Sequence, residues 1–91
     1  MWRSILAKVL ARRGHGAEAE ELAREAVARA EATDYHSMRG DAQLDLAEVL
    51  KLAGRTDEAI GAARAAEERY EPKGDRVLAE RARAFAASLS V

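Results

Sequence analysis

Two histidines, His15 and His36, are the side chains of this sequence best suited to bind a transition metal. A metal site usually needs two ligands four residues apart on a helix, or several ligands in a tight cluster. His15 stands between two glycines, and the best partner for His36 is Asp34, two residues before it. Because one such pair supplies too few ligands, both histidines are interpreted as solvated loop residues, and no bound metal is expected.

The remaining polar residues match no catalytic or phosphate-binding motif. Gly14-His15-Gly16 lacks the preceding strand and the following Gly-Lys-Ser/Thr of a P-loop, so it is interpreted as a tight turn. The serines lack a Gly-x-Ser-x-Gly elbow, and the sequence contains no cysteine. Glu20 and Glu25 each stand four residues before an arginine, Arg24 and Arg29, and these pairs are expected to form ordinary ion pairs on helix surfaces. The sequence therefore predicts a protein that is not an enzyme and needs no cofactor.

Charge and hydropathy restrict the classes of partner. The 91 residues carry a net charge of −1 with both signs interspersed, whereas nucleic-acid-binding proteins usually present a basic patch. The same balance argues against docking on acidic membranes. No apolar run has the length of a membrane span, and the first residues lack the apolar core of a signal peptide. We therefore expect a cytoplasmic protein that binds a protein or peptide, and neither nucleic acid nor membrane.

The elements that must position these side chains are predicted to be helices. Apolar residues make up 48% of the chain, and most are alanine and leucine, which are strong helix formers. They recur at helical spacing in five stripes. The stripes are Trp2, Ile5, Leu6, Val9 and Leu10; Ala19, Leu22, Ala23, Ala26 and Ala30; Met38, Ala42, Leu46, Val49, Leu50 and Ala53; Ala59, Ile60, Ala63, Ala66 and Tyr70; and Leu78, Ala82, Phe85 and Leu89. Five helices leave only short connections, which force antiparallel neighbours.

Cap residues predict where these helices begin and end. The third helix is expected at about 35–53, with Asp34 as its N-cap and Gly54 in a left-handed conformation after it. Thr56 is predicted to cap the fourth helix through its hydroxyl, and Asp75 is predicted to cap the fifth.

The chain also repeats itself at a fixed interval. Leu6-Ala7-x-Val9-Leu10 corresponds to Leu46-Ala47-x-Val49-Leu50, and Gly14 corresponds to Gly54. Each unit places large apolar residues on its first helix, then a glycine turn, then small residues on its second helix. This pattern predicts a single all-α domain over 1–91, with repeat 1 at about 1–33, repeat 2 at about 35–71 and a capping helix at about 75–90.

These units resemble the tetratricopeptide repeat. The second unit reads Leu46-Ala47, Leu50, Gly54, Asp57-Glu58-Ala59, Ala63 and Ala66, and the first reads Leu6-Ala7, Leu10, Gly14, Glu18-Ala19, Ala23 and Ala26. The interval from Leu6 to Leu46 is longer than the usual period of about 34 residues. It is similar to the variant found in the helical C-terminal regions of large bacterial signalling ATPases, nucleotide cyclases and transcriptional regulators. The resemblance implies a right-handed α-solenoid of two antiparallel hairpins and a C-terminal capping helix.

The resemblance also implies a non-catalytic scaffold for protein–protein interaction. In such domains the first helices of successive hairpins line a concave groove that holds a partner. By the repeat alignment, the candidate groove residues here are Lys8, Arg12, Glu48, Lys51 and Arg83.

The two ends of the stack are a second candidate surface, because solenoid units bury their faces only against neighbours. Large apolar residues left at an end favour contacts. The candidates are Trp2, Ile5, Val9, Phe85 and Leu89. One alternative follows from this, that the chain forms a homodimer through an end face. The resemblance implies another, that the chain is an excised C-terminal piece of a multidomain nucleotide cyclase or transcriptional regulator.

Overall fold

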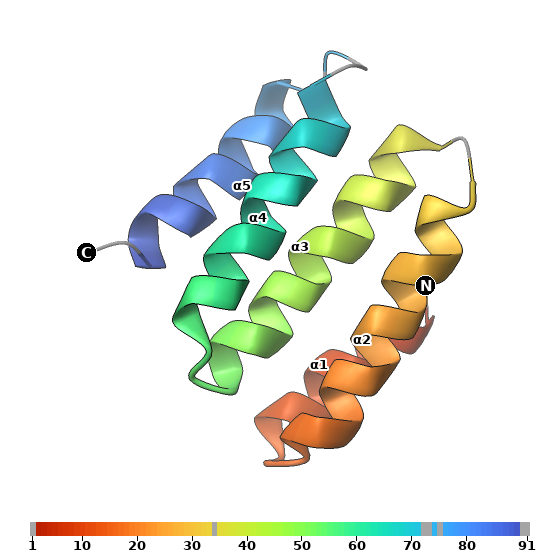
Figure 1. Ribbon diagram of the computed structural model, residues 1–91, viewed down its shortest axis with the longest axis vertical. Coiled ribbons are helices and arrows are strands. Elements are labelled where there is room, and N and C mark those ends of the chain that lie inside the picture. Colours follow the sequence, from red (N-terminus) through yellow and green to blue (C-terminus); the bar gives the residue numbers. More distant parts are fainter. Residues whose placement is uncertain (1, 34, 72–73, 75, 90–91) are drawn as a thin grey trace.

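The described part of the chain consists of five helices and contains no strand (Figure 1). The computed structural model describes residues 2–33, 35–71, 74 and 76–89, and of residues 2–5, 36 and 37 it describes the backbone alone. The helices are α1 (Trp2–Arg12), α2 (Gly16–Glu31), α3 (His36–Leu52), α4 (Thr56–Tyr70) and α5 (Arg76–Leu89). The predicted all-α class is confirmed.

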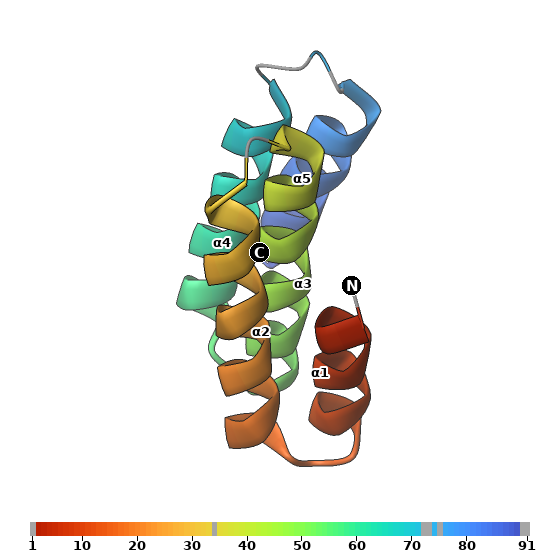
Figure 2. The same cartoon turned by 90° about the vertical axis from the view of Figure 1, so that its right-hand side faces the viewer.

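The helices form a slab of 35 × 32 × 16 Å. α2 and α4 lie on one side of this slab, and α1, α3 and α5 lie on the other (Figure 2). Each helix packs against the next one along the chain, and α1 also contacts α3. Because α1 is short, its N-terminal end lies about midway along α2 and α3, and the other half of these two helices extends beyond it (Figure 2).

The turns after α1 and α3 are built in the same way. Gly14 and Gly54 have φ values of 86° and 78°, in the left-handed region that glycine enters without steric cost. In each turn the amide after the glycine donates to the carbonyl four residues before the glycine, at 2.8 and 2.9 Å. Such hydrogen bonds satisfy carbonyls that the end of a helix leaves free. The predicted role of Gly54 is therefore confirmed.

The N-terminal caps differ from the prediction. Arg55 occupies the N-cap position of α4 and forms no side-chain cap hydrogen bond, so the predicted cap by Thr56 is wrong. Thr56 already belongs to the first helical turn, one position past the cap residue that faces the free amides. Asp34 and Asp75, the other two predicted caps, lie outside the described residues.

Alanine fills most of the contacts between helices. Small side chains allow helices to approach closely, and a few large ones fill the remaining volume. The main buried cluster consists of Ala7, Ala19, Ala23, Leu46, Ala47, Val49, Leu50, Ala59, Ala62, Ala63 and Ala86. Two residues of the predicted third stripe are nevertheless exposed. Met38 is 42% exposed because it lies on the part of α3 that α1 does not cover, and Ala53 follows the last turn of α3.

Candidate functional site

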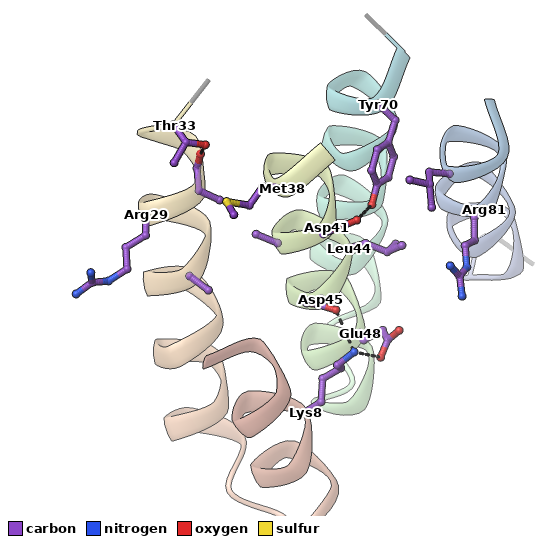
Figure 3. A pocket seen from close by; sticks show the side chains of 14 residues that line it. Lys8, Arg29, Thr33, Met38, Asp41, Leu44, Asp45, Glu48, Tyr70 and Arg81 are labelled. Atoms are coloured by element: carbon purple, nitrogen blue, oxygen red, sulfur yellow. Dashed lines mark hydrogen bonds and ion pairs between the residues drawn. The ribbon is translucent and has the colours of Figure 1, made fainter. Parts of the chain in front are cut away.

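A cavity of about 550 Å³ lies beyond the N-terminal end of α1 (Figure 3). We call this cavity the notch. All five helices contribute to its walls, and α3 contributes the most residues. The lining residues are Lys8, Ala26, Arg29, Ala30, Thr33, Met38, Asp41, Ala42, Leu44, Asp45, Glu48, Tyr70, Leu78 and Arg81.

One face of α3 supplies the notch with three carboxylates. Asp41, Asp45 and Glu48 follow one another at intervals of four and three residues, so their side chains share one side of the helix. Lys8 Nζ lies 3.0 Å from Asp45 Oδ1 and 3.9 Å from Glu48 Oε2 (Figure 3). Lys8 therefore pairs with two of the three carboxylates, and Arg29 and Arg81 are the other two cations among the described residues that line the notch.

Tyr70 forms another wall of the notch and is fixed by two neighbours. Its side chain is 1% exposed, and its ring lies so close to Gly40 that a Cβ atom there would stand 2.5 Å from ring atom Cε1. The Tyr70 hydroxyl donates a hydrogen bond of 2.5 Å to Asp41 Oδ1 (Figure 3). Burial, reinforced by this hydrogen bond, raises the pKa of Tyr70 far above its usual value, so the hydroxyl remains a donor. The sequence predicted Tyr70 on an apolar stripe but not its contact with Gly40. The available signal was Gly40 itself, because a lone glycine inside a predicted helix often marks a close contact.

The predicted groove residues are not all brought together. Lys8 and Glu48 both line the notch and form an ion pair with each other. Arg12 is exposed at the end of α1. Lys51 Nζ lies 5.6 Å from the centre of a phenylalanine ring on α5, and Arg83 Nη2 lies 2.7 Å from a carboxylate oxygen on α4. These last three residues do not belong to the notch lining.

The first helix exposes an apolar face at the N-terminal end of the slab. Leu6 and Val9 are 38% and 37% exposed, whereas their counterparts in the second repeat, Leu46 and Val49, are 5% and 0% exposed. The difference arises because α1 and α2 pack against α3, whereas no helix of the described chain packs against the equivalent face of α1. The side chains of Trp2 and Ile5 lie outside the described residues.

The C-terminal end of the slab is more closed. Phe85 and Leu89, the two predicted contact residues at this end, are partly buried and pack against the main core cluster. Lys51 covers the Phe85 ring in a cation–π contact. The apolar stripe of α5 therefore faces α4, and the large apolar side chain that α5 leaves most exposed is Val77, at 78%.

Ion pairs join α2 to α4 along the opposite side of the slab. Arg69 Nε lies 2.9 Å from Glu31 Oε2, and Arg55 pairs with Glu20, which also accepts a hydrogen bond of 2.7 Å from Arg24. The hydrogen bond from Arg24 lowers the pKa of Glu20 below its usual value, and Arg55 adds to this effect. Burial would raise the pKa of Glu31, but its hydrogen bonds, led by that from Arg69, outweigh burial and hold the pKa below its usual value.

No family model, curated protein or solved structure matches this chain. What its surfaces bind is therefore inferred from their own contacts, burial and charge. Among the described residues, apolar side chains stay open to solvent at the notch and on the α1 face, and also singly at Tyr35, Leu52 and Val77.

The described residues hold no grouping of three or more histidine, cysteine, aspartate or glutamate side chains that could bind a metal ion. His15 is exposed in the turn between α1 and α2. Asp34, as well as the side chain of His36, lies outside the described residues. Among the helices described, none is long and apolar enough to cross a membrane.

Proposed function

We propose that this chain is a non-catalytic scaffold for protein–protein interaction, of the tetratricopeptide type. The observation that carries the proposal is the difference between equivalent residues of the two repeats. Val49 is 0% exposed and Val9 is 37% exposed, so the chain presents to solvent a face that it buries completely one repeat later. Exposed faces of this kind are typical of contact surfaces.

The helix boundaries support the repeat on which this proposal depends. Equivalent helices end or begin at equivalent positions: α1 ends at Arg12 and α3 at Leu52, α2 begins at Gly16 and α4 at Thr56, and α3 begins at His36 and α5 at Arg76. Each of these pairs is separated by the same interval as Leu6 and Leu46 in the sequence. This agreement favours a stack of two hairpins, α1–α2 and α3–α4, with α5 as the capping helix.

Photo-crosslinking in the cells that make the protein tests the proposal. A photoreactive amino acid is placed at Val9 on the α1 face, at Met38 in the notch, or at Arg64 on α4 as a control, all of which are exposed. We expect a discrete crosslinked protein from Val9 or Met38 and none from Arg64. Crosslinking from neither position, or equal crosslinking from all three, contradicts an interaction module with these surfaces.

A homodimer is the second candidate function, and the chemistry of the two ends favours a symmetric one. The α1 face is apolar at Leu6 and Val9, whereas α5 exposes charged residues such as Arg76 and Glu80 beside Val77. A head-to-tail contact would place apolar against charged surface, while a two-fold contact places the same apolar patch on both copies. Such an interface should bury about 1,200 Å² or more.

A further inference from the structure

The last turn of α2 belongs to neither of the two buried apolar clusters. Among the described residues, the members that α2 gives to the main cluster lie between Ala19 and Val27, and the second cluster includes no residue of α2. After Val27, the described side chain of α2 that is buried is Ala30, at 5% exposure. Because an alanine has little apolar surface to remove from water, the hydrophobic effect holds this end of α2 weakly.

Polar contacts with α3 and α4 hold the end of α2 in its place. Arg69 Nε of α4 donates to both carboxylate oxygens of Glu31, at 3.1 and 2.9 Å, and Gln43 Nε2 of α3 donates to Glu31 Oε2 at 3.4 Å. Arg39 of α3 donates to the backbone carbonyl of Thr33, two residues beyond α2. The side chains of Arg69 and Glu31 are 33% and 28% exposed, so solvent screens this ion pair only in part.

The two ends of α2 are therefore held by different forces. Glu20, near the start of α2, also pairs with a residue of the second hairpin, Arg55, but the neighbouring Ala19 is fully buried in the main cluster. Arg29, in the last turn, pairs with Glu25 of the same helix, a contact that joins no other helix to α2. At the end of α2, the contacts of Glu31 thus do the work that apolar packing does at its start.

We propose that residues 28–33, the last turn of α2 and the two residues after it, form a movable wall of the notch that Glu31 latches shut. When the hydrogen bonds to Glu31 break, this segment opens locally while the main cluster keeps the rest of α2 in place. Ala30 and Thr33 line the notch, so the opening changes its width. The inference does not depend on what the notch binds, and the proposed function can hold without it.

Thiol labelling of the full chain tests whether this segment opens by itself. The chain contains no cysteine, so Ala30→Cys and Ala23→Cys each place one thiol at a buried position of the same helix, 5% and 1% exposed. We expect Ala30→Cys to react at least about tenfold faster. Its rate should stay nearly constant at low urea, because a local opening exposes little surface, whereas the rate of Ala23→Cys should rise steeply.

Variants of the ion pair test whether Glu31 is the latch. Glu31→Gln should raise the labelling rate of Ala30→Cys about two- to tenfold, the range for loss of a partly buried, charge-assisted contact. Arg69→Gln should have the same effect, and the two changes together should add little, because they break one contact. Glu21→Gln, exposed on α2, is the matched charge control and should leave the rate unchanged.

Two results would overturn the inference. Equal labelling rates and equal urea dependence for Ala30→Cys and Ala23→Cys would show that α2 opens as a whole. A labelling rate of Ala30→Cys that Glu31→Gln leaves unchanged would show that Glu31 does not hold the segment. Crosslinking from Val9 or Met38 would stand after either result, so failure of the latch and failure of the proposed function are distinguishable.

Discussion

Gly40→Ala should destabilise the protein although it replaces a helical glycine. In an ordinary helix interior this change stabilises by about 0.5–1 kcal/mol, because glycine has the greater backbone freedom to lose on folding. Here the added Cβ would meet Tyr70 ring atoms at 2.5, 2.7 and 2.8 Å, far inside van der Waals contact. The ring is 1% exposed and its hydroxyl is held by Asp41, so it cannot move aside freely. Overpacking of this kind costs about 1–3 kcal/mol, which exceeds the gain in propensity.

Gly61→Ala is the matched control, because Gly61 is also helical and nothing lies within 4 Å of the Cβ that would be added. Thermal and urea unfolding followed by circular dichroism should show a loss of about 1–2 kcal/mol for Gly40→Ala, the net of the two effects. The control should show a gain of about 0.5–1 kcal/mol. In the Tyr70→Leu background the cost of Gly40→Ala should shrink, because the ring that clashes is gone. If Gly40→Ala stabilises as much as the control, Tyr70 does not pack on Gly40 and this wall of the notch is wrongly described.

Three further results are expected. Leu50→Ala should cost about 2–5 kcal/mol by urea unfolding because Leu50 is 2% exposed, whereas Leu52→Ala, on a side chain 49% exposed, should cost less than about 1 kcal/mol; equal losses would contradict the register of α3. The pKa of Glu31 is lowered in the folded state, so its ion pair stabilises the fold above the unfolded pKa of about 4.3, and this contribution is lost as pH falls through the folded value. The free energy of unfolding, measured from pH 6 to pH 3, should therefore fall less steeply with acid for Glu31→Gln than for the wild type. An unchanged pH dependence would contradict a stabilising ion pair between Glu31 and Arg69. If the chain forms the symmetric dimer, light scattering should show Val9→Glu as a monomer with unchanged helical signal, and a wild-type chain that stays monomeric at high concentration would rule out the dimer.

The helical class and the turns could be predicted because they depend on local features. Apolar periodicity placed all five helices, and Gly54 marked a left-handed turn that the structure contains. The repeat interval read from the sequence reappears in the helix boundaries. Cap chemistry was less reliable, since Thr56 lies one residue inside the helix that it was predicted to cap.

The notch could not be predicted, because side chains from all five helices line it and their meeting in space depends on the tertiary packing. Met38 and Leu46 belong to one apolar stripe, yet Met38 is 42% exposed and Leu46 is 5% exposed, since α1 does not reach the start of α3. Lys8 and Glu48 were predicted to share a groove, and the structure places Lys8 Nζ 3.9 Å from Glu48 Oε2. Arg83 was assigned to the same groove, but its side chain pairs with Glu67 of α4, a contact between helices that spacing along one helix does not reveal.

Thiol labelling tests most directly the claim on which the proposed function depends, that α1 presents to solvent a face that α3 buries. The chain contains no cysteine, so Val9→Cys and Val49→Cys each introduce a single thiol at equivalent positions of the two repeats. At low protein concentration, Val9→Cys should react at nearly the rate of an unfolded thiol. Val49→Cys, at a position 0% exposed, should react at least about a hundredfold more slowly, because labelling requires local opening. Equal rates, or a protected thiol at position 9 in the isolated chain, would contradict the claim that α1 exposes the face that α3 buries.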